Sequence, residues 1–339
     1  MKLPVNATKK YDIVSFPSFD FLAVEMKKKA RGKNVLIVSD DNVAPLYLEE
    51  VKSALSGFFV HTFVFPAGER SKNVDTYLKI VGALAENGFV RQDCVLALGG
   101  GVVGDVAGFV AATYMRGISF VQCPTSFLAM IDSSVGGKTA VDLPQGKNLL
   151  GAFYQPDLVY IALKTLSTLP EREVRCGMGE AVKYAFLSES VTPELLKRGV
   201  TEELIFECLK IKADIVEKDE FDNGTRAFLN LGHTLGHAVE KLSDYSLSHG
   251  ECVVKGLAKI IDMSVKKFSL SEEKKQKMIS LLALSGTEPT LPFGLQEVLA
   301  ETVHDKKREK SGVNFVLLKD IGKPTSVLLT AEEAEALLQ

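Results

Sequence analysis

Residues 93–112 read DCVLALGGGVVGDVAGFVAA, and this stretch decides the fold. Its first six residues, Asp93–Leu98, form a short aliphatic run that predicts a buried strand. Three glycines follow, and Gly99, Gly101 and Gly104 match GxGxxG ahead of a helical pattern. A strand that turns tightly into a helix directs backbone N–H groups at a pyrophosphate. The stretch therefore predicts an α/β fold and favours nucleotide binding at the turn.

The glycine turn lacks one part of the usual dinucleotide-binding pattern. An acidic residue about 20 positions further on should bind the ribose, but that region reads SFVQCPTSF. Asp40 and Asn42 end an earlier strand-like run and are the alternative ribose partners. Glycines after a strand can also serve packing alone, so this alternative to nucleotide binding stays open.

Other strand-like runs alternate with helical patterns through the first half of the chain. Uniformly apolar strands between helices are typical of a parallel sheet covered on both faces, as in a Rossmann-like domain. The predicted strands are Lys33–Ser39, Val60–Phe65, Ser119–Cys123 and Asp157–Ala162. A helix is predicted over Asn73–Glu86, between the strand that ends at Phe65 and the strand at residues 93–98.

The pattern changes near Pro170. From Glu171 to about Ala300 the segments have helical periodicity, and only Asn314–Leu318 and Ser326–Leu329 look extended again. We expect an NAD-type α/β domain at residues 1–170 and a mainly α-helical domain at residues 171–339.

Composition limits the class of protein. Hydrophobic residues make up 46% of the 339 residues and charged residues 24%, as in globular proteins. The net charge of −3 argues against a nucleic-acid partner. Five scattered cysteines without CxxC indicate reduced thiols in the cytoplasm. No apolar run is long enough for a membrane span, and the first residues lack a signal-peptide core.

A second glycine-rich stretch, SSVGGKTAVDLPQGKN, occupies residues 133–148. It differs from the P-loop GxxxxGK[ST], because Asp132 stands where the first glycine is required. Lys138, Lys147, Asn148 and Asp132 can all hold oxygen atoms or anions. We expect a loop here, either a binding loop or an ordinary solvated one.

The richest polar stretch is RAFLNLGHTLGHAVEKL, residues 226–242. Treated as one α-helix, it places Arg226, Asn230, His233 and His237 on the side opposite its leucines. A solvated face would carry Lys and Glu instead. The stretch therefore predicts the wall of a polar cleft.

Histidines four residues apart can share a metal, as in HExxH proteases, but the glutamate is absent from HTLGH. A zinc site formed by one or two of these histidines, His249 and a carboxylate is better supported. Glu180 in RCGMGEAVKY is the carboxylate candidate. Lys183 would share its helical face, although such a pair is often only a surface ion pair.

These motifs together resemble a known family. The motifs that carry the resemblance are, in order along the chain, GGGVVGD, YMRG, PTSFLAMIDSSVGGKTAVDLPQGKNLLGAFYQP, GEAVKY, RAFLNLGHTLGHAVE and HGE. With these motifs the chain resembles the 3-dehydroquinate synthases of the shikimate pathway, which are sugar phosphate cyclases. The resemblance implies a Rossmann-like NAD-binding α/β domain, a mainly helical second domain, and a cleft that holds NAD, zinc or cobalt, and substrate. It also implies a homodimer.

The implied reaction converts 3-deoxy-D-arabino-heptulosonate 7-phosphate into 3-dehydroquinate and phosphate. It proceeds by transient oxidation with NAD, phosphate elimination, re-reduction, ring opening and intramolecular aldol closure. The net reaction is that of a carbon–oxygen lyase, and it contributes to aromatic amino acid biosynthesis.

The resemblance also implies roles for matching residues. The metal ligands are Glu180, His233 and His249. The catalytic residues are Lys138, Asn148, Glu180, Lys183 and His237. The substrate-binding residues are Arg116, Asp132, Lys138, Asn148, Lys183, Lys212, Arg226, Asn230, His237, Lys306 and Lys307. The NAD-binding residues are Asp40, Asn42, Glu69, Lys72, Gly101, Val102, Val103, Gly104, Asp105, Thr125, Ser126, Lys138, Lys147, Thr165, Leu166, Ser167 and Thr168.

Three other functions are compatible with parts of this pattern. Another sugar phosphate cyclase would use the same chemistry on a different sugar phosphate, but the chain keeps the Asn230–His237 pair associated with dehydroquinate synthases. An NAD- and metal-dependent polyol dehydrogenase would release NADH. A non-catalytic NAD-sensing module would not need the intact run of chemically active residues.

Overall fold

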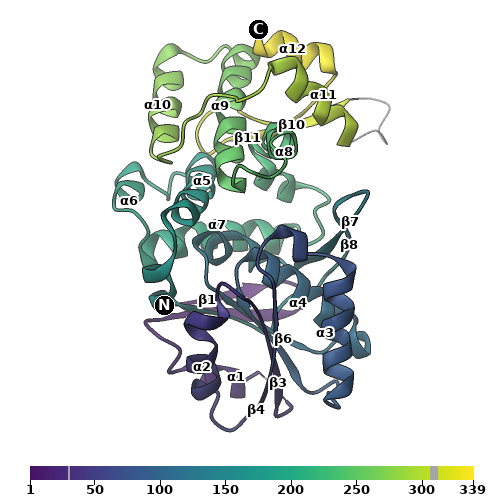
Figure 1. Ribbon diagram of the computed structural model, residues 1–339. Helices are drawn as coiled ribbons and strands as arrows, with labels where there is room; N and C mark the ends of the chain where they lie inside the picture. Colours follow the sequence, from purple (N-terminus) through teal and green to yellow (C-terminus); the bar gives the residue numbers. More distant parts are fainter. Residues whose placement is uncertain (30, 306–311) are drawn as a thin grey trace. The chain divides into compact units, whose positions relative to one another are not determined.

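The computed structural model describes residues 1–29, 31–305 and 312–339, with side chains for all of these except residues 303–305. It divides into two compact units, Met1–Leu169 and Pro170–Gln339 (Figure 1). Unit 1 is an α/β domain and unit 2 is mainly helical, so the predicted fold class is confirmed. Each unit is described by itself.

Unit 1 is built on a seven-stranded sheet in the order β1-β2-β9-β6-β5-β3-β4. In this order, each strand from β2 across the sheet to β4 is parallel to its neighbour. Strand β1 at the other edge pairs with β2 in the antiparallel direction. The predicted strands and the helix between two of them are all present; the hairpin of β1 and β2 was not predicted. The strands are β1 Lys2–Asn6, β2 Lys10–Phe16, β3 Asn34–Asp40, β4 Phe59–Phe65, β5 Cys94–Gly99, β6 Ser119–Pro124 and β9 Leu158–Ala162.

Helices cover both faces of this sheet because its strands are apolar on both sides. Helices α1 (Leu22–Lys27) and α2 (Ala44–Ala54) pack with Val35 and Ile37 of β3 in one core cluster. Helices α3 (Val74–Glu86) and α4 (Gly101–Thr113) pack with alternate residues of the same strand in the other. Figure 1 shows the two pairs of helices on opposite sides of the sheet.

The strand order contains a topological switch point between β3 and β5. From β3 the chain passes outward to β4, and from β5 it passes in the other direction to β6 and β9. Ligands of open parallel sheets bind outside the carboxyl ends of strands at such a point. Here those ends are Asp40 on β3 and Gly99 on β5.

Residues 132–148 do not form the predicted loop. A π-helical turn, Ala129–Ser133, precedes an antiparallel hairpin of β7 (Lys138–Leu143) and β8 (Gly146–Phe153). The expectation of a loop was wrong because most of β8 is exposed and two of its residues are glycines, so no alternation marks it as a strand. Gly151 lets the two strands meet, since a Cβ there would lie 2.2 Å from the carbonyl oxygen of Thr139.

Unit 2 is organised around α9 (His249–Phe268), which packs against α5, α8, α10, α12 and β10. The other helices are α5 Glu171–Leu187, α6 Pro193–Lys197, α7 Glu202–Lys218, α8 His233–Leu242, α10 Glu272–Ala283, α11 Leu295–Asp305 and α12 Ala331–Leu338. The predicted extended tail forms an antiparallel pair, β10 Val313–Leu318 and β11 Pro324–Leu329. Among the described residues, no helix combines the length and the apolar character that a membrane span requires.

The single helix expected over residues 226–242 is broken. Thr225–Asn230 form a 3₁₀ segment, η5, and α8 begins only at His233. Between them Gly232 has φ of 80°, a left-handed conformation that ends one segment and starts the next. Arg226 and Asn230 therefore do not continue the face of α8 that carries the histidines, and the helical-wheel prediction of one polar line was wrong.

Glycines allow the helices of unit 2 to approach until their backbones touch. A Cβ at Gly256 of α9 would lie 2.0 Å from the carbonyl oxygen of Gly232, at the start of α8. A Cβ at Gly250 of α9 would lie 1.9 Å from the carbonyl oxygen of Cys176 on α5. These contacts fix the positions of the residues that α5, α8 and α9 carry.

Replacing Gly256 by alanine should destabilise unit 2, because the new methyl group has no space against the backbone of Gly232. Overpacking of this kind costs roughly 1–3 kcal/mol, which should lower the thermal unfolding midpoint by several degrees. The matched control is Gly82→Ala in α3, where a Cβ meets nothing within 4 Å. That control should stabilise its helix by about 0.5–1 kcal/mol. Equal unfolding midpoints for the two variants would contradict the proposed packing.

Candidate functional site

A fully buried carboxylate, that of Glu180 on α5, lies at the centre of the polar residues of unit 2. Its Oε1 atom is 3.3 Å from Nε2 of His233 and 3.2 Å from Nε2 of His249. Its Oε2 atom is 2.5 Å from Nζ of Lys183, which is also buried. The alternative of a surface ion pair between Glu180 and Lys183 is therefore excluded.

The two histidines are the first residues of their helices. His233 follows the left-handed Gly232, and its Nδ1 lies 3.1 Å from the carbonyl oxygen of Leu231. His249 starts α9 after Ser248, whose N–H donates to the carboxylate of Glu251 in a capping box. The Nδ1 atom of His249 lies 3.3 Å from the carboxylate of Glu240. In both rings the partner of Nδ1, which is Leu231 for His233 and Glu240 for His249, holds Nε2 toward Glu180.

Charge controls protonation in this cluster. Burial alone would raise the pKa of Glu180, but Lys183 and then His233 hold it well below its usual range. Burial would lower the pKa of His249, but hydrogen bonds to Glu180 and Glu240 raise it to about 10. Without a metal, His249 therefore carries a proton, and a metal ion would take the place of that proton.

The geometry of Glu180, His233 and His249 fits a zinc-like ion. Tetrahedral zinc with bonds of about 2.0–2.2 Å to nitrogen and oxygen has ligand atoms about 3.4 Å apart along each edge. The observed separations from Oε1 of Glu180, 3.3 Å and 3.2 Å, are close to this value. One carboxylate oxygen and two neutral imidazole nitrogens form a common ligand set for catalytic zinc.

His237 lies in the same cluster but is more exposed than His233. The ring centroids of the three histidines are 5.1–5.7 Å apart, and one nitrogen from each lies within 4.8 Å of the others. A three-histidine set is thus an alternative to the set that includes Glu180. We favour the latter because the separations from Glu180 Oε1, 3.3 Å and 3.2 Å, match the edge of a tetrahedral zinc site.

Three buried cations occupy neighbouring elements of unit 2. Lys183, Lys212 and Arg226 are 1%, 6% and 2% exposed, and α7, which carries Lys212, packs against both α5 and η5. The backbone N–H of Arg226 donates to Asp219, and its guanidinium donates to the carbonyl oxygen of Glu220. Cations form strong, charge-assisted hydrogen bonds with carboxylates and phosphates, so this set suits an anionic substrate.

Three other residues of this unit are expected to bind substrate: Asn230, Lys306 and Lys307. Asn230 ends η5 and is exposed. Lys306 and Lys307 lie outside the described residues.

In unit 1 the expected NAD residues gather around the switch point. The Asp40 carboxylate accepts N–H bonds from Asn42 and Val43, and burial raises its pKa although these bonds oppose the rise. Helix α4 begins at Gly101, directly after β5, without a side-chain cap, so its first N–H groups face outward from the helix end. Gly104 permits close packing on β6, because a Cβ there would lie 2.8 Å from Gln122.

A polar network connects the same helix to the hairpin. Nζ of Lys72 is 2.6 Å from Asp105 on α4 and 2.6 Å from Oδ1 of Asn148 on β8. Burial would lower the pKa of Lys72, but Asp105 and Glu69 raise it. Glu69 in turn lies 3.1 Å from Nζ of Lys147. Four residues expected to bind NAD and one expected to bind substrate are thus in mutual contact.

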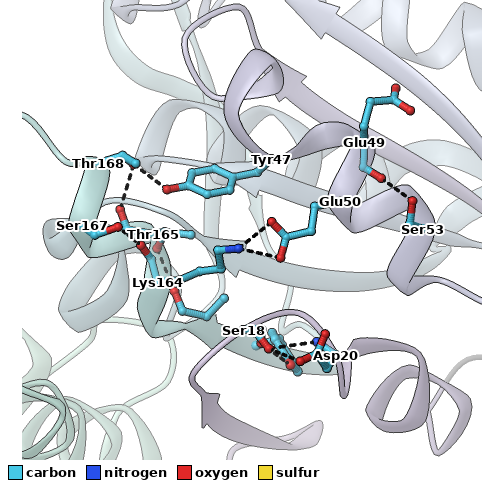
Figure 2. A network of polar contacts seen from close by, with 12 residues as sticks. Ser18, Asp20, Tyr47, Glu49, Glu50, Ser53, Lys164, Thr165, Ser167 and Thr168 are labelled. Atoms are coloured by element: carbon cyan, nitrogen blue, oxygen red, sulfur yellow. Dashed lines mark hydrogen bonds and ion pairs between the residues drawn. The ribbon is translucent and has the colours of Figure 1, made fainter.

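The last expected NAD segment, Thr165–Thr168, lies in the 3₁₀ segment η4 (Leu163–Thr168), which is held against α2. The Tyr47 hydroxyl is 2.5 Å from the hydroxyl of Thr168, and Nζ of Lys164 is 2.7 Å from both carboxylate oxygens of Glu50. Figure 2 shows both contacts. Thr165 is buried and donates to the carbonyl oxygen of Ala162 at the end of β9. This segment therefore lies at the same carboxyl-terminal edge of the sheet as Asp40.

The remaining residues expected in unit 1 differ in exposure. Thr125 is buried and donates its N–H to Gly99, and Ser126 accepts from Ala129. Arg116 is exposed and has φ of 64°. Lys138 is exposed at the start of β7, and Asp132 is half-buried in the π-helical turn.

Sequence reasoning missed three residues that hold these sites in place. Glu240 lies 3.3 Å from Nδ1 of His249, Tyr47 bonds Thr168, and Asp142 bonds the backbone of Asn148. Glu240 lies three residues after His237 on one helix, and this spacing was the available signal. Nothing in the sequence points to the partner of Tyr47, because Thr168 is distant in the chain. The partner of Asp142, Asn148, also could not be predicted, because it depends on the turn between β7 and β8.

Comparisons with known proteins agree on one family. Family models described as 3-dehydroquinate synthase N-terminal and C-terminal match residues 62–176 and 177–308. The 3-dehydroquinate synthase of Desulforamulus reducens is 40% identical over 333 residues, covering 94% of this chain and 92% of the relative. That of Pelobacter propionicus is 44% identical over 313 residues, covering 88% and 87%.

Solved structures share the fold at lower identity. A 2-deoxy-scyllo-inosose synthase, complexed with carbaglucose-6-phosphate, NAD+ and Co2+, has a TM-score of 0.88 at 24% identity and covers 100% of this chain and 99% of its own. A 2-epi-5-epi-valiolone synthase from Streptomyces hygroscopicus with NAD+ and Zn2+ bound has a TM-score of 0.83 at 25% identity, with coverages of 97% and 95%. The matched domain models and the close relatives show that the chain belongs to the 3-dehydroquinate synthase family.

Proposed function

We propose that this chain converts 3-deoxy-D-arabino-heptulosonate 7-phosphate into 3-dehydroquinate and inorganic phosphate, a carbon–oxygen lyase reaction of the shikimate pathway. The observation that carries the proposal is 40–44% identity to 3-dehydroquinate synthases over most of the chain. The buried cluster of a carboxylate, histidines and cations in unit 2 also supports the proposal, because these groups can hold a metal ion and an anionic substrate.

The site residues have separate tasks in this proposal. Glu180, His233 and His249 hold a divalent metal ion, zinc or cobalt, and Asp40, the start of α4, Lys72 and η4 hold NAD. Bound NAD supplies reversible oxidation of a substrate hydroxyl, and the metal supplies Lewis acidity at that oxygen. His237, outside the proposed ligand set, orients substrate hydroxyls.

The substrate carries a phosphate and a carboxylate, and the chain has a net charge of −3. Local cations must therefore bind these groups. In this proposal Lys183, Lys212 and Arg226 of unit 2 do so. Charge-assisted hydrogen bonds from such groups are roughly twice as strong as neutral ones.

Another sugar phosphate cyclase remains the nearest alternative. The cyclases of known structure reported above share the fold, but their identity to this chain is 24–25%. The dehydroquinate synthases are much closer in sequence, which favours the heptulosonate phosphate as substrate. A glycerol dehydrogenase from Schizosaccharomyces pombe has a TM-score of 0.69 at 18% identity, so its likeness concerns the fold alone.

We also place the protein in the cytoplasm and propose that it forms a homodimer. All five cysteines lie in the described residues and are free and buried, as expected in a reducing compartment. Within the described sheet pairings, β8 pairs with β7 alone and exposes Leu149, Leu150 and Phe153. An open strand edge that carries apolar side chains is suited to a second copy of the chain.

The purified protein, given NAD, zinc or cobalt and the heptulosonate phosphate, should release phosphate without accumulation of NADH. The cofactor is restored in each turnover, so absorbance at the NADH band should stay flat while phosphate is produced. NADH formed in proportion to substrate consumed would reject the synthase and favour a polyol dehydrogenase. No turnover with either metal would favour an NAD-sensing module.

A matched pair of lysines on α7 provides the control for this assay. Lys212→Met removes a buried cation and should lower kcat/KM for the heptulosonate phosphate by roughly 10- to 100-fold, the value of a charged hydrogen bond. Lys210→Met removes an exposed partner of Glu207 and should leave kcat/KM unchanged.

Bound zinc should depend on His249 but not on His237. His249→Ala removes a proposed ligand and should weaken zinc binding by more than about tenfold, the lower limit seen even for outer-shell changes. His237→Ala should leave the metal content close to that of the unaltered protein. Zinc per chain is measured after dialysis against a weak chelator, with circular dichroism to confirm folding. Equal losses in both variants would instead support the three-histidine ligand set.

Leu150→Lys should convert the proposed dimer into a monomer, because a charge on the apolar edge of β8 opposes its burial. Light scattering after size exclusion measures the mass in solution. Leu78→Lys, on an exposed position of α3, is the control and should remain dimeric. A monomeric unaltered protein would refute the dimer, and a dimeric Leu150→Lys variant would place its interface elsewhere.

A further inference from the structure

Asp142 on β7 joins the hairpin to the segment that carries Lys72. Its backbone N–H donates to the carbonyl oxygen of Lys72 at 2.8 Å, and its Oδ1 accepts the backbone N–H of Asn148 at 2.8 Å. One residue thus holds the backbones on both sides of the contact between Lys72 and Asn148. Asp142 is half-buried and is not among the residues assigned to the substrate, the metal or NAD.

The conformation of Asn148 requires such support. Its φ is 56°, in the left-handed region, which is strained for an L-residue, although asparagine tolerates it better than most. Such conformations persist where surrounding contacts hold them. The bond from the Asn148 N–H to Asp142 is the backbone contact that does so, and the bond from Lys72 to Oδ1 holds the side chain.

This arrangement determines what Asn148 can recognise. An asparagine side chain has one carbonyl oxygen and two N–H donors. With Oδ1 bonded to Lys72, Asn148 offers N–H donors to a ligand, and these select acceptor oxygens such as hydroxyl, carboxylate or phosphate groups.

The charges near Lys72 strengthen the same arrangement. Asp105, Glu69 and Asp142 all favour the protonated form of Lys72. Burial raises the pKa of Asp142, while the N–H of Asn148 and the charge of Lys72 oppose that rise. The network therefore contains two cations, Lys72 and Lys147, among the carboxylates of Glu69, Asp105 and Asp142, with Asn148 as its neutral member.

We propose that Asp142 is a positioning residue of the NAD and substrate site: it fixes Asn148 in its left-handed conformation and thereby sets the directions of Asn148 and Lys72. Asp142 acts through these residues and does not itself contact the ligand. The inference rests on the proposed function for the identity of the ligand, NAD, that Lys72 binds.

The test compares Asp142→Ala with Asp142→Asn in the full chain. Alanine removes the acceptor for Asn148 N–H and should raise the dissociation constant of NAD by about tenfold, the effect of one lost hydrogen bond. Asparagine keeps a carbonyl oxygen at the same place and should restore affinity to within about twofold. NAD binding is titrated calorimetrically without substrate, so the result does not depend on turnover.

A double-mutant cycle distinguishes positioning from a general structural role. Glycine adopts φ of 56° without strain, so in an Asn148→Gly background the Asp142→Ala change should no longer affect NAD binding. An equal loss of NAD affinity in both backgrounds would show that Asp142 acts only through hairpin stability and would overturn the proposal. The Asn148→Gly pair also keeps the test decisive if Asp142→Ala alone fails to fold.

Failure of the synthase proposal gives a different result. An unaltered chain that binds NAD but releases no phosphate from the heptulosonate phosphate would reject the proposed function and leave the inference on Asp142 intact. An Asp142→Ala variant that binds NAD as tightly as the unaltered chain would overturn the inference, as would an unaltered chain that does not bind NAD.

Discussion

The burial of one carboxylate, that of Glu180, is the constraint on which the arrangement of unit 2 depends. A charged group with no solvent exposure is costly unless cations or a metal surround it. Lys183 supplies one partner from the same helix, and His233 and His249 supply the others from α8 and α9. These helices come close enough only because glycines stand where their backbones touch, so packing and chemistry impose the same geometry.

Unit 1 meets a different requirement, which is to gather residues from distant parts of the chain at one edge of a sheet. The parallel strands do this without any special contact, because their carboxyl ends lie together. Asp40 on β3, the glycine turn after β5 and η4 after β9 meet this edge for that reason. The hairpin of β7 and β8 joins this edge through the backbone bond from Asp142 to Lys72 and through the side-chain bond from Lys72 to Asn148.

The sequence was sufficient for features that local periodicity encodes. The strands around Val35 and Leu96 follow from short, uniformly apolar runs, and the helices between them follow from a period of 3.6 residues. It was insufficient where one residue changes the backbone, as at Gly232, which divides the expected histidine helix into two segments. Nor could spacing show that Glu180 and Lys183 are buried together, since burial is a property of tertiary packing. The division of labour between His233 and His237 came from family resemblance.

Both proposed histidine ligands are the first residues of their helices. The amino-terminal end of an α-helix bears a partial positive charge of about half an electron, and here the first side chains of two helices, His233 and His249, contact the same carboxylate. The field at this point therefore favours anions even in a chain with a net charge of −3. The two helix ends do not favour the metal cation itself. They favour the negatively charged oxygen atoms of a substrate that the metal would bind.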